Sequence, residues 1–317
     1  TLASGTTHGS IHLMQPLLSV FTITTLLLSL LLVTAPASSE EHSRSYTLWY
    51  RNYDSGAVRS LLELALKKTP EYGDYRLLRS QEMAQGRALL ELARNERKLL
   101  DIATVATTQE REEDLHAIPV PIDGGLLGLR VCVTTRDRIS RFEGINSLDD
   151  LRKRDIVIGQ GAHWPDTPIL EAAGIRVVTH SRYEVLFRML ENGRFDCFAR
   201  GVSEVLYDLE KHSNPDLVIE PDLLIAYPMP SYFFTAPEDH ETAQRIRLGL
   251  ERAIEDGSFA RYLQTWYGRP VEELELNRRI TIDLPNPYLS EESARIGRRT
   301  LEALRRRIEA AVSQVES

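Results

Sequence analysis

Residues 193–205 read GRFDCFARGVSEV, and they repeat an earlier pattern of the chain with a different ending. Residues 86–111, GRALLELARNERKLLDIATVATTQER, predict an amphipathic helix, a buried strand and a polar turn that ends at Arg111. Residues 182–204 repeat this order and end in a turn that carries Arg200. Ligands of open α/β sheets bind beyond the carboxyl ends of the strands. Two such units therefore predict two lobes that face one cleft, and the two arginines predict an anion in it.

The flanking sequence continues the alternation of strand and helix. Strands are predicted at 46–50, 75–79 and 99–106, with helices between them, which favours a parallel sheet with crossover helices. A second unit of the same kind extends over residues 147–221, and its first helix is capped by a serine. The β-rich run at 231–237 can return the chain to the first lobe.

These parts predict an α/β protein with two lobes, each a mostly parallel sheet with flanking helices, joined by a two-strand hinge. The predicted organisation is a signal peptide at 1–37 with an upstream extension at 1–13, the first part of lobe one at 38–130, lobe two at 131–230, the return to lobe one at 231–285, and a C-terminal helical tail at 286–317.

The N-terminus has the pattern of a secretory signal. Residues 1–39 contain no Lys, Arg, Asp or Glu, residues 17–33 are almost wholly apolar or hydroxylic, and an A-x-A sequence ends at Ala37. This pattern predicts cleavage after Ala37, with Met14 as the initiator and a periplasmic mature protein. The alternative is an uncleaved anchor, because about twenty apolar residues can span a bilayer.

The charge of the chain excludes one class of partner. The sequence contains 38 basic and 46 acidic residues, for a net charge of −8. Proteins that bind nucleic acids normally present a basic face, so no nucleic-acid partner is predicted. The length favours two domains over one, and no later apolar stretch is long enough to cross a membrane.

The chain has two cysteines, Cys132 and Cys197, in the apolar segments LRVCVTT and FDCFA. They can be two small buried core residues or a disulfide, and the sequence leaves both open. The tail has a similar ambiguity. Residues 290–315 predict a helix with one apolar and one basic face, which either packs on a lobe or contacts anionic lipid.

With these parts placed, residues 44–268 resemble the amino-acid-type (family three) extracellular solute-binding proteins, which have the type-two periplasmic binding fold. The residues that carry the resemblance are the helix-Asp-strand-TTxxR passage from Leu89 to Arg111, the LxGL crossover from Leu126 to Val133, SLDDL followed by IVIGQG, and the late DGSFARYLQTWYG helix. The block GQGAHWPDTPIL resembles a branch of that superfamily with a GQGxxWPDT motif.

The resemblance implies a ligand site. Arg111 matches the arginine that holds the ligand α-carboxylate, for which a planar guanidinium can make two parallel bonds. Thr107 and Thr108 match residues that complete the carboxylate site. Gln160 and Gly161 match a turn at a helix start, where free backbone N–H groups meet an anion.

Further positions are expected around the ligand. Trp164 follows in the same loop and is expected to form a wall of the cleft. Tyr50 and Tyr53 occupy the place where the family often stacks an aromatic ring on the ligand, and Asp54 can meet an ammonium group.

Arg200 departs from the family pattern, which usually has an aspartate there for the ligand ammonium. Either Glu204 takes over the ammonium, or the ligand lacks one and carries a second acidic group, and the second interpretation is favoured. An uncompensated cation would oppose an ammonium. Arg200 can instead pair with Glu204 along a helix, which would stabilise the helix start.

The predicted function is periplasmic capture of a small anionic solute, amino-acid-like or an organic acid, by a monomer that serves an ABC-type importer through a membrane permease. The alternative is a sensing module that regulates a membrane partner. A dehydratase-like enzyme with Glu204 or Asp166 as acid or base is a further alternative. No nucleophile or zinc motif occurs in the sequence, so no enzyme, cofactor or metal is predicted.

Overall fold

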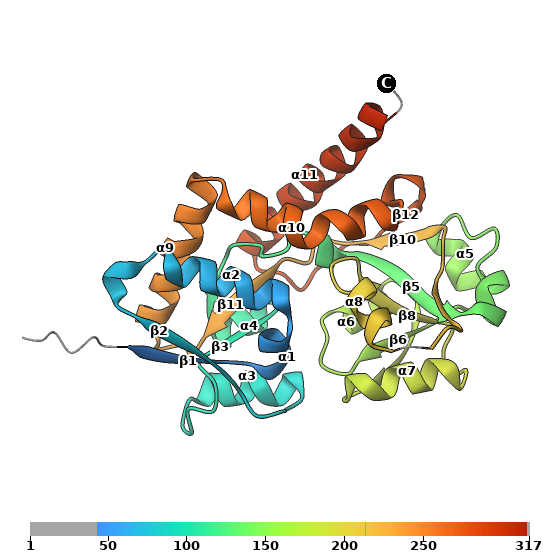
Figure 1. The fold of residues 1–317 in the computed structure, drawn as a ribbon. Helices are drawn as coiled ribbons and strands as arrows, with labels where there is room; N and C mark the ends of the chain where they lie inside the picture. The colour runs from blue at the N-terminus through green and yellow to red at the C-terminus, as the bar shows by residue number, and fades with distance from the viewer. Residues whose placement is uncertain (1–42, 213, 316–317) are drawn as a thin grey trace, which may run out of the picture. The chain divides into compact units, whose positions relative to one another are not determined.

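The computed structural model describes residues 43–212 and 214–315, and the side chains as far as residue 309. The predicted signal peptide, its upstream extension and the alternative membrane anchor lie outside the described residues. Within Ser43–Ser317, which form one compact unit, the strands build two sheets (Figure 1).

The first sheet has the strand order β2-β1-β3-β11-β4 and forms the core of lobe one. Its strands are β1 (Arg44–Leu48), β2 (Tyr75–Arg79), β3 (Ile102–Ala106), β4 (His116–Ile118) and β11 (Ser231–Thr235). Its helices are α1 (Tyr50–Asp54), α2 (Gly56–Lys67), α3 (Gln85–Arg94), α4 (Gln109–Asp114), α9 (His240–Glu255) and α10 (Ser258–Glu273), with a 3-10 turn at Pro70–Tyr72.

Helices α2 and α9 pack together on one face of this sheet, and α3 lies on the other (Figure 1). Apolar residues at helical spacing explain the position of α2, because Leu61, Leu62 and Ala65 are all fully buried. The Ser55 side chain accepts a hydrogen bond from the Val58 amide and fixes the start of this helix.

The second sheet has the order β12-β10-β5-β8-β6-β7, and β9 also pairs with β5. Its strands are β5 (Leu129–Thr135), β6 (Val157–Gly161), β7 (Arg176–His180), β8 (Cys197–Gly201), β9 (Leu217–Ile219), β10 (Leu223–Ala226) and β12 (Ile280–Asp283). Its helices are α5 (Leu148–Lys153), α6 (Asp166–Ala172), α7 (Tyr183–Glu191) and α8 (Val205–Lys211), and further 3-10 turns lie at Leu126–Gly128, Arg136–Arg141 and Leu276–Arg278.

Both sheets are mixed, whereas the sequence predicted mostly parallel ones. In each sheet the parallel and the antiparallel ladders are equal in number. The difference arises at the strands that enter or return between lobes, because β11 and β5 run antiparallel to every strand with which they pair. The α/β class and the two-lobed arrangement are as predicted.

The chain crosses between the two sheets more often than the predicted two-strand hinge requires. Two crossings, from β4 to β5 and from β10 to β11, are the predicted ones. One more follows near the C-terminus, because β12 pairs with β10 in the second sheet before the chain reaches α11 (Glu291–Val315). The assignment of residues 280–283 to lobe one is therefore wrong.

The C-terminal segment then contacts lobe one again. The hydroxyls of Ser290 and Ser293 each donate a 2.6 Å hydrogen bond to the carboxylate of Glu112 on α4. The Gln109 amide donates to the Tyr288 carbonyl at 2.9 Å. The segment that follows β12 therefore links two parts of the protein. It binds α4, the helix that carries Arg111, and it continues directly from β12, the edge strand of the second sheet.

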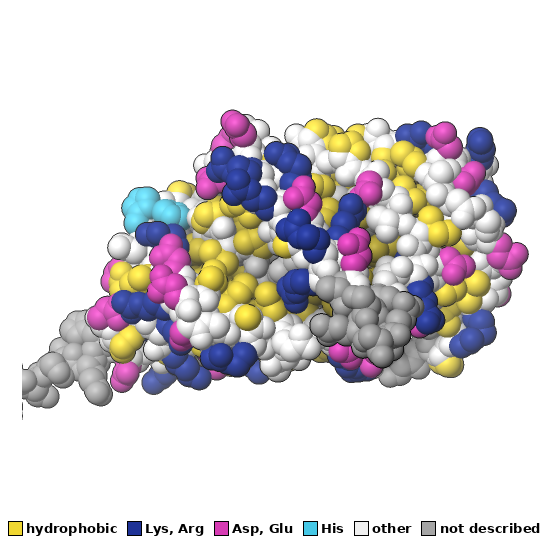
Figure 2. Space-filling view, turned by 90° about the horizontal axis from the view of Figure 1, so that it is seen from above, with side chains coloured by type: hydrophobic (Ala, Val, Ile, Leu, Met, Phe, Trp, Pro, Cys, Tyr) yellow, Lys and Arg dark blue, Asp and Glu magenta, His cyan; other side chains and the backbone are white. Residues whose placement is uncertain are grey.

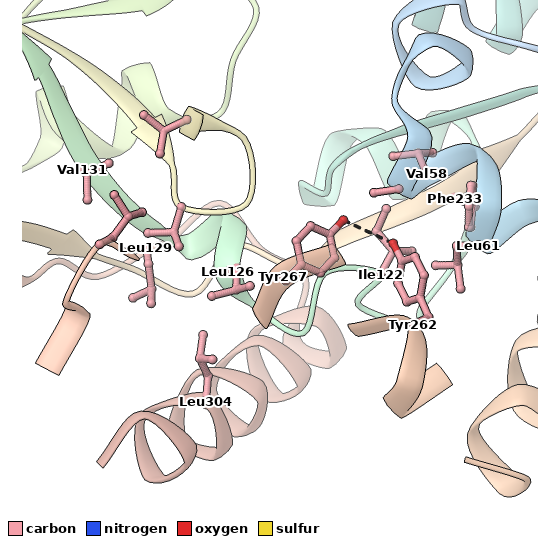
Figure 3. Close-up of a cluster of buried hydrophobic side chains, with 14 of the residues drawn as sticks. Val58, Leu61, Ile122, Leu126, Leu129, Val131, Phe233, Tyr262, Tyr267 and Leu304 are labelled. Carbon is pink, nitrogen blue, oxygen red and sulfur yellow. Dashed lines mark hydrogen bonds between the residues drawn. The ribbon is translucent and has the colours of Figure 1, made fainter. Parts of the chain in front are cut away.

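Helix α11 packs on the crossing between lobes. Leu301 and Leu304 are buried, and Figure 3 shows Leu304 directed toward the turn that carries Leu126. Beside it, the hydroxyls of Tyr262 and Tyr267 lie 3.2 Å apart in a hydrogen bond (Figure 3). Residues 291–309 of the tail therefore form a helix that packs on the protein, which was one of the two interpretations of the sequence. Contact of the tail with lipid stays a prediction.

The two cysteines form a disulfide inside the core of lobe two. Cys132 lies on β5 and Cys197 on the neighbouring antiparallel strand β8, with their Cα atoms 5.0 Å apart. Both are buried, and they pack with the cluster that includes Leu170. The sequence left two possibilities open, buried core residues or a disulfide. The structure has a disulfide, and its two cysteines are also part of the buried core.

The described surface carries both signs of charge. Figure 2 shows basic and acidic side chains interspersed over the face seen from above. No helix within residues 43–212 and 214–315 is both long enough and apolar enough to span a bilayer. The same residues contain no group of three or more His, Cys, Asp or Glu side chains that could hold a metal ion.

Candidate functional site

A cavity of about 780 Å³ lies between the two lobes. Lobe one contributes α1 and the starts of α2 and α3, together with the end of β3 and Arg111; lobe two contributes the starts of α6, α7 and α8 and residues of β8. Its volume is in the range of small-molecule sites, about 300–1,000 Å³. Of the residues predicted from the sequence, six line it: Tyr50, Arg111, Gly161, Trp164, Arg200 and Glu204.

Arg111 is positioned by the first turn of α4, where the Thr108 hydroxyl accepts a 3.2 Å hydrogen bond from the Arg111 amide. Its guanidinium donates to the Ala106 carbonyl and, through Nη2, to Gln85 Oε1 at 3.1 Å. Nη2 also donates to the His163 carbonyl at 2.7 Å. Because His163 belongs to lobe two, this bond crosses the cleft.

The electrostatics of Arg111 favour an anion. No carboxylate of the described residues forms an ion pair with it, and burial lowers its pKa to about 10 although the charges of Asp166 and Glu110 oppose this shift. The guanidinium therefore stays charged at neutral pH while its cost of desolvation is not offset by a paired acid. A ligand carboxylate in the cavity would offset that cost.

Arg200 also lines the cavity, but it is not the uncompensated cation that the sequence suggested. It lies within β8, opposite Val131, and not in a turn, because the strand extends to Gly201. Its Nε is 2.7 Å from Asp208 Oδ2, and its Nη2 is 3.0 Å from Glu204 Oε2. The inference that few acids compensate this cation is therefore wrong.

Three aromatic rings surround the Arg200 guanidinium. Its Cζ lies 4.9 Å from the ring centroid of Trp164 and 5.2 Å from those of Tyr183 and Phe198. The residue is only 2 % exposed. Arg200 thus acts first as an internal support that holds two acids and three rings in place.

Glu204 is the accessible carboxylate of this cluster. Its side chain is 41 % exposed, although Arg200 lies 3.0 Å and Arg130 3.9 Å away. Burial raises its pKa, but the charges of Arg200, Arg130 and Arg51 outweigh this effect and lower the pKa overall. Glu204 therefore remains ionised at neutral pH and can accept hydrogen bonds from a ligand ammonium.

A second buried ion pair, which the sequence did not reveal, lies next to it. Arg130 Nε is 2.7 Å from Asp166 Oδ1, and the Tyr227 hydroxyl donates to the same oxygen at 2.5 Å. All three side chains are almost completely buried. Asp166 comes from the WPDT part of the predicted motif, where it begins α6, so its role here is to fix the start of that helix at the cavity wall.

Trp164 and Gly161 form one wall together. The Trp164 ring stacks on Phe198, with the centroids 6.0 Å apart. A Cβ atom at position 161 would lie 2.5 Å from the indole, so the glycine is required for this packing. Tyr50 lies on the opposite lobe, half-buried, with the Arg79 Cζ 5.2 Å from its ring centroid.

Five predicted site residues do not line the cavity, and three of them make structural bonds. The Thr107 hydroxyl is fully buried and donates to Glu112. Thr108 serves as the cap of α4. Gln160 is fully buried in β6, where its Nε2 donates to the Ala199 carbonyl at 3.2 Å. Their side chains therefore make bonds within the protein, and a contribution of the backbone of Thr107 and Thr108 to the carboxylate site stays a prediction.

The other two lie at the end of α1. Tyr53 packs against Arg59, and Asp54 pairs with Arg79 through bonds of 2.8 and 2.9 Å. Gln160 and Gly161 were expected in a turn at a helix start, but they are the last two residues of β6, and α6 begins only at Asp166. Ala162 follows β6 directly, and its amide donates to the His180 carbonyl of β7 at 3.0 Å.

Several lining residues were not found from the sequence. The Asn52 side-chain amide donates to the Thr104 carbonyl and accepts from the Thr104 amide. The buried Thr104 hydroxyl has no hydrogen-bond partner in the described part of the chain. Asp123 lies in the IDGG turn between lobes and accepts bonds from the amides of Gly125 and Leu127. Burial raises the pKa of its carboxyl to about 6.

No model of a known family and no curated protein matches the sequence. Solved structures do match. An ancestral arginine-binding protein bound to arginine is 16 % identical with a TM-score of 0.52, covering 70 % of this chain and 98 % of that one. An arginine-specific periplasmic binding protein of Salmonella typhimurium is 16 % identical with a TM-score of 0.53, covering 71 % and 100 %.

The GluR0 ligand-binding core of Nostoc punctiforme, in complex with L-glutamate, is 14 % identical with a TM-score of 0.51, covering 71 % of this chain and 99 % of that one. At such identities the likeness concerns the fold. The chain therefore has the two-lobed α/β fold of the periplasmic amino-acid-binding proteins.

Proposed function

We propose that the protein captures a small solute with an amino-acid head between its two lobes. The observation that carries this proposal is Arg111, a charged guanidinium in the interlobe cavity that forms no ion pair with the described residues. A planar guanidinium can bind a carboxylate by two parallel hydrogen bonds. The ligand carboxylate would replace the carbonyl contacts of Arg111 or add to them.

The ammonium group of such a solute would bind Glu204. The case for a ligand without an ammonium rested on an uncompensated Arg200, and that cation is paired with Asp208 and Glu204. Glu204 is ionised and accessible, and this supports the other interpretation of the sequence, in which Glu204 replaces the family's usual aspartate. Organic acids without an ammonium are then weaker candidates.

Capture would couple to the relative position of the lobes. Besides the bond from Arg111 to His163, an ion pair between Arg269 and Glu210 joins α10 to α8 at 2.9 Å. A ligand between the lobes would add contacts to both and favour their approach by hinge motion. Delivery to an ABC-type importer through a membrane permease would follow, with the protein acting as a periplasmic monomer.

The disulfide supports a location outside the cytoplasm, because such bonds persist in oxidising compartments. A sensing module would use the same capture chemistry and differ only in the partner that reads the closed form. For an enzyme, Asp166 is unsuited, and Glu204 could serve only as a base. Asp166 is held by Arg130 and Tyr227, and the arginines around Glu204 keep it ionised.

A thermal-shift screen of the standard amino acids and their des-amino analogues tests the proposal. A ligand at a hundred times its dissociation constant stabilises by about 2.7 kcal/mol. For a protein of this size that corresponds to a rise in Tm of about 5 °C. The proposal expects at least one α-amino acid to raise Tm by this amount and its des-amino analogue to raise it much less. If no amino acid changes Tm, the proposal is wrong.

A further inference from the structure

Arg51 is a further cation that lines the cavity. It lies on α1 of lobe one, half-buried, and its side chain lines the cavity. Its Cζ lies 4.0 Å from the ring centroid of Tyr183, which belongs to lobe two. Within residues 43–212 and 214–309, no side chain forms an ion pair or a hydrogen bond with the Arg51 guanidinium.

The other half-buried or buried arginines of the cavity differ from Arg51 in this respect. Arg130 pairs with Asp166 and Arg200 with Asp208, both at 2.7 Å. Arg111 donates to two carbonyls and to a glutamine. Arg51 alone among these four has all its N–H donors without a partner in the described part of the chain.

No carboxylate of the described residues forms an ion pair with Arg51, although the charge of Arg51 contributes to the lowered pKa of Glu204. Arg182 and Glu184, on either side of Tyr183, both line the cavity and are exposed, but neither pairs with Arg51. Contact with the Tyr183 ring occupies the face of the guanidinium and leaves its edge, where the N–H groups lie, free to bind an acceptor. A half-buried guanidinium whose N–H groups have no partner among the described residues is suited to bind an anionic group of a ligand.

We infer that Arg51 forms a second anion subsite, which binds the side-chain carboxylate of an acidic amino acid. The inference rests on the proposed function, in which Arg111 holds the α-carboxylate and Glu204 the ammonium. Because Tyr183 comes from lobe two, the subsite is complete only when the lobes are together. Arg51 and Arg111 both line the same cavity of about 780 Å³.

Isothermal titration with L-glutamate and with its neutral isostere L-glutamine tests the inference in three proteins: wild type, Arg51→Met and Arg59→Met. Arg59 is the matched control, because it is also half-buried and lies 5.3 Å from a tyrosine ring centroid, that of Tyr53, but does not line the cavity. Wild type should bind L-glutamate more tightly than L-glutamine.

In Arg51→Met, binding of L-glutamate should weaken by at least about tenfold, while L-glutamine should change less than about twofold. Arg59→Met should retain the wild-type preference. If Arg51→Met weakens both ligands equally, Arg51 only joins the lobes and the inference is overturned. If wild type binds L-glutamine as tightly as L-glutamate, the inference fails while the proposed function stands. If wild type binds neither and the amino-acid screen is also negative, the proposed function itself fails.

Discussion

Replacing Arg200 by methionine distinguishes an internal support from a free ligand-binding cation. The Arg200 and Asp208 side chains are 3 % and 6 % exposed, and their ion pair measures 2.7 Å. In Arg200→Met, the Asp208 carboxylate would be left buried without its partner. Removing one member of a buried pair typically costs about 3–5 kcal/mol. The Glu204 contact adds less, because that side chain is 41 % exposed and partly solvated.

For a protein of this size, about 3–5 kcal/mol corresponds to a fall in Tm of about 6–10 °C. The loss should depend on pH. Burial raises the pKa of Asp208 even with Arg200 present, and removal of that cation would raise it further. A carboxyl whose pKa is raised on folding stabilises the folded state at low pH and loses this effect as the pH increases. The destabilisation should therefore be larger at pH 8 than at pH 5.

Thermal unfolding followed by circular dichroism, without ligand, measures this in wild type, Arg200→Met, Asp208→Asn and the double variant. The double variant should recover much of the loss, because it removes both charges of the pair. Arg176→Met is the control, since it removes an exposed ion pair with Asp155 in the same lobe and should change stability by less than about 1 kcal/mol. The reasoning is refuted if Arg200→Met melts within about 2 °C of wild type.

Two further predictions concern the stability of the two-lobed unit. Reduction of the Cys132–Cys197 disulfide, which closes a loop with a sequence separation of 65, should lower the free energy of unfolding by about 4 kcal/mol, measured by urea unfolding with and without reductant; equal midpoints would contradict it. For Asp123, the folded pKa of about 6 lies above the unfolded value of about 3.9, so its contribution to stability is present below about pH 4 and lost as the pH rises to about 6. Urea unfolding should show that Asp123→Asn lacks about 2 kcal/mol of the wild-type decrease in stability between pH 4 and pH 7, and an unchanged decrease would contradict the buried carboxyl.

Much of the fold could be predicted because its signals are local in the sequence. Helix α2 has apolar residues at helical spacing, and β3 is a short apolar run that is buried at every position. The last strand could not be predicted in this way. β12 is the four-residue segment ITID, and only its pairing with β10 places it in lobe two.

For the candidate site as well, residues with a local sequence signal could be predicted, and contacts between distant residues could not. Arg111 follows directly from its position after β3, since the end of a strand points to the cleft. The pair of Arg200 with Glu204 was among the interpretations of the sequence. Its second partner, Asp208, was missed because it lies eight residues further on and reaches Arg200 only after α8 folds back over β8. Arg51 and Tyr183 belong to different lobes, and no local pattern indicates that they meet.

The measurement that tests the central claim most directly is isothermal titration of L-glutamate into Arg111→Met and Arg87→Met. Arg87 is the matched control, because it lies on the exposed side of α3, pairs with Glu91 at 3.5 Å and does not line the cavity. Loss of one partner of a desolvated charge pair costs about 2–5 kcal/mol, which is about thirtyfold or more in Kd. We predict this loss for Arg111→Met and an unchanged Kd for Arg87→Met. Equal Kd values for wild type and Arg111→Met would contradict capture of the solute by its carboxylate between the lobes.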